Sequence, residues 1–95
     1  LENNTTVTSL DLWACGVSAE DGLVVAEMLK KNRTITNVNL GSNKLYDVGC
    51  RAMAEVVAIN TTLRALLLHA NGITTHGVLP LLKALGRNVA LQNLV

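Results

Sequence analysis

The side chains best suited to chemistry in this sequence are two histidines, His69 and His76, and two cysteines, Cys15 and Cys50. Imidazole and thiolate groups are common zinc ligands, and structural zinc sites gather four of them at short, regular spacings. No cysteine or carboxylate joins the two histidines at such a spacing. The sequence therefore predicts no metal site.

A more regular polar signal comes from asparagine. The interval between Asn43 and Asn71 is the same as the interval between Cys15 and Asn43. Apolar residues recur at this interval too, as at Leu12, Leu40 and Leu68. Because the period falls between about 20 and 50 residues, the polar positions must be held by a stack of similar structural units.

Aligning the sequence with itself at this interval needs no gap. It divides the chain into repeats at 4–31, 32–59 and 60–87, with a partial repeat at 88–95, while residues 1–3 match the end of a preceding repeat. Neither terminal repeat has the polar cap that stacked repeats usually carry. We expect a single domain that belongs to a longer stack, and we expect its uncapped ends to associate end to end.

Each repeat contains a strand and a helix. Alternating apolar residues predict strands at 9–12, 37–40 and 65–68. Apolar residues four apart predict helices at roughly 19–30, 47–58 and 76–86. Ser18 and Asp21 resemble a capping box at the first helix, and Pro80 is expected to delay or bend the start of the third.

The strand segments follow the pattern LxxLxLxx(N/C)xL, which resembles leucine-rich repeats over the whole chain. The repeat length and the full helix are similar to those of the ribonuclease-inhibitor subfamily, which includes repeats of NOD-like receptors, Ran GTPase-activating protein and tropomodulin-type actin cappers. The resemblance implies an α/β solenoid, a horseshoe segment with a parallel sheet on its concave face and helices on its convex face.

In that fold the asparagine row forms a structural ladder of Cys15, Asn43 and Asn71. Asn43 and Asn71 are expected to turn inward and bond the backbone of the bends. Cys15 is expected to serve there as a small core residue. Cys15 lies at a bend and Cys50 on a helix, so we predict that both are reduced thiols, as is typical of cytoplasmic proteins.

Strand side chains that point away from the core form the concave face. We predict that a protein partner binds there through Asp11, Trp13, Asn37, Asn39, Arg64, Leu67 and His69. Leu67 interrupts a polar row, and tryptophan is a frequent anchor of interfaces. Gly41, between Trp13 and His69, is expected to leave a notch. The alternative is incidental exposure, because scattered apolar surface residues are normal.

Composition and motifs argue against several classes of function. The net charge is +1 and the basic residues are scattered, which argues against nucleic acid as the main partner. Apolar runs are short, so no membrane span is predicted. Phosphate-binding glycine motifs are absent, and separate repeats would hold a nucleophile and its base apart. We therefore expect a cytoplasmic protein–protein interaction module, not an enzyme, with no cofactor.

Two other functions stay open at this point. One branch of the resembled subfamily regulates small GTPases, although this chain has no loop extension to carry that activity. The repeats could instead be purely structural spacers. Asn-x-Thr triplets at Asn3, Asn4, Asn32 and Asn60 match glycosylation sites, but most recur at the repeat period and are expected to serve the turn between helix and strand.

Overall fold

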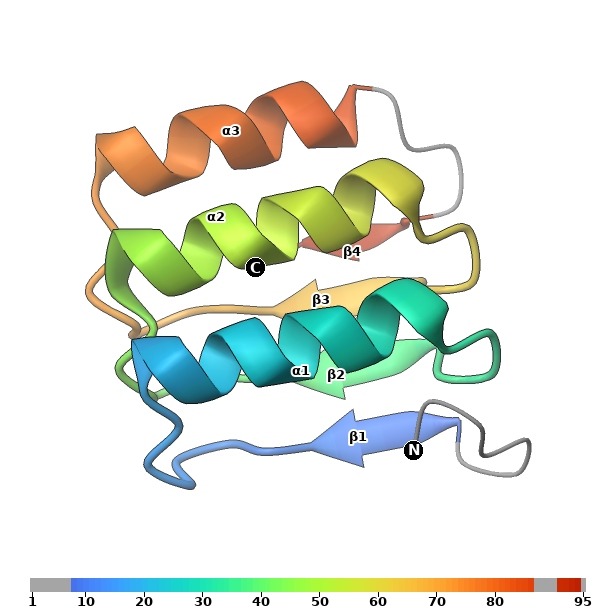
Figure 1. Ribbon diagram of the computed structural model, residues 1–95, viewed down its shortest axis with the longest axis horizontal. Coiled ribbons are helices and arrows are strands. Elements are labelled where there is room, and N and C mark those ends of the chain that lie inside the picture. The colour runs from blue at the N-terminus through green and yellow to red at the C-terminus, as the bar shows by residue number, and fades with distance from the viewer. Residues whose placement is uncertain (1–7, 87–90, 95) are drawn as a thin grey trace.

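The computed structural model describes residues 8–86 and 91–94 of the 95-residue chain. Strand and helix alternate along the chain (Figure 1). The elements are β1 (Ser9–Asp11), α1 (Ala19–Lys31), β2 (Asn37–Asn39), α2 (Tyr46–Ile59), β3 (Ala65–Leu67), α3 (Thr75–Leu85) and β4 (Asn93–Leu94). None of the bounds predicted for the first three strands and the three helices differs by more than one residue from the observed one, a difference expected at fraying ends. The segment at 1–3, interpreted as the end of a preceding repeat, lies outside the described residues.

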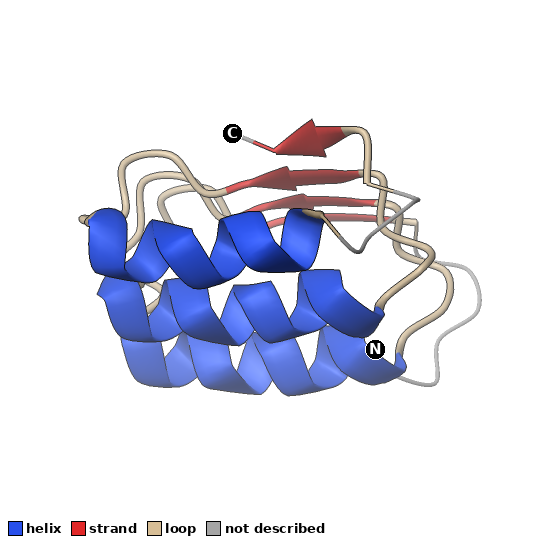
Figure 2. Cartoon of the chain, turned by 90° about the horizontal axis from the view of Figure 1, so that it is seen from above, coloured by secondary structure: helices blue, strands red, loops and turns tan. Residues whose placement is uncertain are grey.

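The strands form one parallel sheet in the order β1-β2-β3-β4. Ser9 pairs with Asn37, Asn37 with Ala65, and Ala65 with Asn93, so each strand residue pairs with its equivalent in the next repeat. All three helices lie on one side of this sheet (Figure 2). The predicted α/β solenoid with a parallel sheet and helices on the convex face is confirmed.

The core lies between the sheet and the helices. Leu40, Leu45 and Leu66 are completely buried, and Met53 on α2 is equally inaccessible. Small residues bring the elements together around Leu45: a methyl group on Gly22 would lie 2.6 Å from Leu45 Cδ2, and one on Gly49 would lie 2.6 Å from Leu45 Cβ. Both glycines are therefore needed for close packing.

The three helices begin differently. Ser18 caps α1 with the predicted capping box, in which its side chain accepts from Asp21 N and the Asp21 side chain accepts from Ser18 N. Thr74 caps α3, whereas α2 begins at Tyr46 with no side-chain cap and a left-handed φ of 53°. The delayed start expected for α3 is wrong, because α3 begins at Thr75 and contains Pro80. Pro80 is the sixth of the eleven residues of α3, and its missing N–H leaves one helical hydrogen bond unmade.

A polar contact joins the starts of α2 and α3. Thr74 N donates to Asp47 Oδ1 at 2.7 Å, and the Thr74 hydroxyl donates to Asp47 Oδ2. The hydroxyl bond first, and then the backbone bond, hold the pKa of Asp47 below its usual value of 3.8. A carboxylate that accepts hydrogen bonds only in the folded state stabilises the fold while it is charged.

This contact predicts acid sensitivity. Because the pKa of Asp47 is lower in the folded than in the unfolded chain, its contribution is complete above about pH 4 and is lost as the pH falls through the folded-state value. We expect Asp47→Asn to weaken the decline in stability between about pH 5 and pH 2, which urea denaturation at each pH would measure. An unchanged decline would contradict the assignment.

Candidate functional site

The side chains of Asn43 and Asn71 form a ladder between successive bends. Asn43 Nδ2 donates to Leu12 O and Leu40 O at 2.9 Å, and Asn43 Oδ1 accepts from Val17 N at 2.9 Å. Asn71 repeats this one step later, with Nδ2 donating to Leu40 O at 2.8 Å. Each amide thus reaches back to the preceding repeat. Both asparagines are buried, at 7% and 2% exposure.

Cys15 does not behave as a core residue, and that expectation is wrong. Its side chain is exposed, with Sγ 3.5 Å from Trp13 O, while its backbone N–H donates to Asn43 Oδ1 at 3.1 Å. The reason is its place beside β1, at the edge of the sheet, where no further described strand covers it. Cys50 is buried on α2, and both cysteines are free. Burial raises the pKa of the Cys50 thiol.

A hollow of about 210 Å³ lies over the strand face opposite the helices. Leu67 and Ala65 give it apolar walls on β3, and Asn37 and Asn39 line it from β2. Asp11 on β1 is at its far side. The structure therefore brings four of the predicted binding residues, Asp11, Asn37, Asn39 and Leu67, around one depression. Their part in binding a partner stays a prediction.

Two of these side chains are also used locally. Asp11 Oδ1 accepts from Trp13 N, and Asn39 Oδ1 accepts from Gly41 N, each at 3.0 Å. Such a turn two residues onward is the usual conformation of Asp and Asn at the end of an element. Leu67 occupies the same place in the third repeat and has no oxygen to accept this bond. Leu67 therefore lacks the local hydrogen bond and instead presents apolar surface to the hollow.

Trp13 and His69 follow the strands at the same edge. Trp13 is 54% exposed, and His69 and Arg64 are exposed as well. The predicted notch at Gly41 is wrong, because a methyl group on Gly41 would lie 2.3 Å from His69 Cε1. The imidazole of His69 thus covers Gly41. Gly41 is needed for this close approach and not for a left-handed bend, in contrast to Gly72, whose φ is 67°.

The repeated Asn-x-Thr triplets have a structural explanation. Asn32 and Asn60 are both 1% exposed. Asn32 Oδ1 accepts from Ile35 N and Asn60 Oδ1 accepts from Leu63 N, both at 2.7 Å. These bonds shape the turn between each helix and the next strand, and Asn60 Nδ2 adds a bond to Leu29 O at 2.8 Å. In this fold neither amide is open to a glycosylating enzyme. Asn3 and Asn4 lie outside the described residues.

Residues 8–86 and 91–94 contain no group of three His, Cys, Asp or Glu side chains placed to hold a metal ion. The same residues include no helix long and apolar enough to cross a membrane.

The stacked strand–helix repeats, the parallel register of one repeat per strand and the inward asparagine ladder define a leucine-rich-repeat solenoid with repeats of the ribonuclease-inhibitor type. The family described as Leucine Rich repeat matches residues 31–54. Protein NLRC5 of Mus musculus is 31% identical over 93 residues, which is 98% of this chain and 5% of that protein. Leiomodin-2 of Homo sapiens is 36% identical over 69 residues, which is 73% of this chain and 13% of that protein.

Solved structures give the same architecture. The structure of Leiomodin-1 Actin-Binding Site 2 matches with a TM-score of 0.93 and 32% identity, over 99% of this chain and 56% of that chain. The tropomodulin C-terminal domain of Caenorhabditis elegans matches with a TM-score of 0.88 and 19% identity, over 98% of this chain and 56% of that chain, which supports the fold alone. This chain therefore spans a small part of the NLRC5 and leiomodin-2 sequences and about half of either solved domain.

Sequence reasoning missed two surface features. The first is Tyr46, which is 51% exposed and lies against Gly72, where a methyl group would be 2.7 Å from its Cδ1. The second is a groove between α2 and α3 on the helical side of the molecule. A usable signal for the first was the tyrosine itself, which stands where the other repeats have Ser18 and Thr74. The groove depends on distances between helices, which the repeat pattern does not give.

Proposed function

We propose that this chain is a protein–protein interaction module that binds its partner on the concave face, through Asp11, Trp13, Asn37, Asn39, Arg64, Leu67 and His69. The observation that carries the proposal is the hollow against Leu67, at the position where the first two repeats use a polar side chain for a local turn. The exposed Trp13 at the adjoining edge supplies the kind of large, rigid side chain on which interfaces depend.

Actin is the first partner to test. The leiomodin-1 structure is named as an actin-binding site, and that domain shares 32% identity with nearly the whole of this chain. The chain spans only 56% of that domain, so residues outside it are expected to contribute part of any shared surface. We also propose that the protein acts in the cytoplasm and has no catalytic activity.

Trp13→Ala is expected to weaken partner binding about thirtyfold, the effect of losing an interfacial anchor worth roughly 2 kcal/mol. Binding to monomeric actin would be measured by fluorescence anisotropy with a labelled protein. Val24→Ala is the matched control, because Val24 is 70% exposed on α1, on the opposite side of the molecule. Equal affinities of the two variants would contradict the concave-face proposal, while absence of actin binding by the parent protein would reject actin alone.

The remaining alternatives give different results. A regulator of a small GTPase would accelerate GTP hydrolysis in a single-turnover assay, and a pure spacer would bind nothing through Trp13.

End-to-end association rests on a separate observation, a hollow of about 420 Å³ lined by Ile73, Leu81 and Leu94 next to the edge strand β4. Sedimentation across a dilution series tests it, and a molecular mass that does not change with concentration would reject it.

A further inference from the structure

A second groove lies on the convex side, between α2 and α3, which run next to each other in Figure 1. It has a volume of about 370 Å³. Its apolar surface comes from small residues, Ala54 and Ala58 on α2 and Pro80 and Ala84 on α3. Arg51, Glu55 and Lys83 supply its charged groups. We refer to these seven residues as the outer groove.

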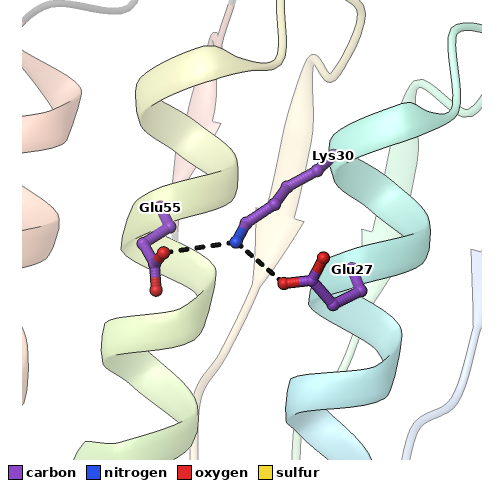
Figure 3. A network of polar contacts seen from close by, with 3 residues as sticks. All are labelled: Glu27, Lys30 and Glu55. Carbon is purple, nitrogen blue, oxygen red and sulfur yellow. Dashed lines mark hydrogen bonds and ion pairs between the residues drawn. The ribbon is translucent and has the colours of Figure 1, made fainter.

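The equivalent space between α1 and α2 is bridged by a lysine. Lys30 Nζ lies 3.0 Å from Glu27 Oε1 and 3.2 Å from Glu55 Oε1, so its side chain crosses from one helix to the next (Figure 3). One repeat later, alanine stands at the lysine position, as Ala58, and lysine stands at the position of Glu55, as Lys83. The same bridge therefore cannot form between α2 and α3, and the outer groove stays uncovered.

The charges of the outer groove are unequal. Glu55 is already paired with Lys30 across the α1–α2 space. The side chains of Arg51 and Lys83 are exposed, and no ion pair or hydrogen bond to either is found among residues 8–86 and 91–94. Asp47, one turn before Arg51, has its carboxylate bonded to Thr74. Two cations thus flank an apolar surface. Glu55 is paired with Lys30, while Asp47 accepts hydrogen bonds from Thr74 and also attracts Arg51 electrostatically without a direct ion pair.

We propose that the outer groove binds an acidic, aliphatic segment of a partner protein, as an interaction surface separate from the concave face. A leucine-sized side chain would contact mainly Ala58 and Pro80, above a floor formed by Ala54 and Ala84, which are 5% and 6% exposed. Carboxylates on either side of it would pair with Arg51 and Lys83. Because apolar contact and charge must both match, a basic segment of the same hydrophobicity would be rejected.

A fluorescein-labelled peptide, Glu-Asp-Leu-Ala-Leu-Glu-Asp, serves as the probe, and Lys-Lys-Leu-Ala-Leu-Lys-Lys is its basic counterpart. We expect the acidic peptide to bind the full chain and the basic one to fail, as measured by anisotropy up to millimolar protein. Arg51→Glu combined with Lys83→Glu should weaken binding at least about tenfold, since two charge-assisted contacts become repulsive. Trp13→Ala should leave binding unchanged, which separates this surface from the concave face.

A second variant tests the proposal by filling the outer groove as well as changing its charges. Ala58→Lys combined with Lys83→Glu restores the arrangement seen around Lys30, so the new lysine should cross the groove and abolish binding of the acidic peptide. Both positions are exposed, so the fold should be retained, as circular dichroism would verify. Undetectable binding by the parent protein, equal binding of the basic peptide, or full binding by either double variant would overturn the proposal.

Discussion

Leu45→Ala is expected to lower the free energy of unfolding by about 2–5 kcal/mol, which is the cost of deleting a fully enclosed leucine side chain. Leu45 is 0% exposed and is held between Gly22 on α1 and Gly49 on α2, close enough that neither glycine has room for a methyl group. Because tight backbone packing limits collapse into the space, the cavity should persist. Thermal or urea denaturation measures the loss, with Leu23→Ala as the control, since Leu23 is 43% exposed on α1.

A double-mutant cycle tests the packing more sharply. In the parent protein, Gly22→Ala gains helix propensity of about 1 kcal/mol but brings a methyl group within 2.6 Å of Leu45 Cδ2. After Leu45→Ala the obstruction is gone, and the added methyl group also fills part of the cavity. The effect of Gly22→Ala on stability should therefore be more favourable in the Leu45→Ala variant than in the parent, where the methyl group meets Leu45, with a coupling of roughly 0.5–3 kcal/mol. Additive effects would show that these residues are not packed as described.

Periodicity predicted the elements of this fold because each repeat must bury the same faces against its neighbours. The strands at Ser9–Asp11, Asn37–Asn39 and Ala65–Leu67, and the parallel register between them, follow from apolar residues that recur at the same positions of every repeat. The resemblance to leucine-rich repeats predicted that Asn43 would turn inward, because an amide can donate to and accept from the backbone of a bend at once. The local sequence pattern was therefore sufficient to predict the strands, their register and the inward asparagine wherever the repeats are alike.

The features that sequence reasoning missed arise where the repeats differ. Cys15 holds the asparagine position but lies at an edge of the sheet, so its surroundings differ from those of Asn43. The ring of His69 covers Gly41 because glycine alone allows an imidazole so close to the backbone. Contacts of this kind join different repeats in three dimensions. Their geometry depends on the separation of strands and helices, which an alignment of repeats does not give.

The candidate binding residues were only partly predictable for the same reason. Alternation along the strands placed Asp11, Asn39 and Leu67 on one face, and the structure puts all three around the same hollow. The use of Asp11 and Asn39 in local turns was not foreseen, and it changes how the row is interpreted. The polar side chains at Asp11 and Asn39 serve the local turns. The apolar Leu67 at the equivalent position therefore carries more information about binding than the polar residues do. The partner itself depends on surface chemistry that repeats of this class vary freely.

Asn71→Ala is expected to destabilise the protein by about 1–3 kcal/mol for each buried backbone group that it leaves without a partner. The side chain serves four groups: its Nδ2 donates to the carbonyls of Leu40, Leu68 and His69, and its Oδ1 accepts from Leu45 N. Leu40 O keeps a bond from Asn43 Nδ2, and His69 O keeps one from Ser42 N. Leu45 N and Leu68 O would lose the partners found among the described residues.

The loss of stability should therefore come from Leu45 N and Leu68 O. A further substitution separates the contributions of these two groups. Asn71→Asp keeps an acceptor for Leu45 N but replaces the donor with a carboxylate that faces the carbonyls of Leu40 and Leu68. A charge held at 2% exposure beside acceptors is costly, so Asn71→Asp should be at least as destabilising as Asn71→Ala near neutral pH. The exposed Asn37, on the concave face, provides the control, because Asn37→Ala should change stability by no more than about 0.5 kcal/mol. Thermal melts in which Asn71→Ala matches the parent protein would show that the ladder does not hold the bends together.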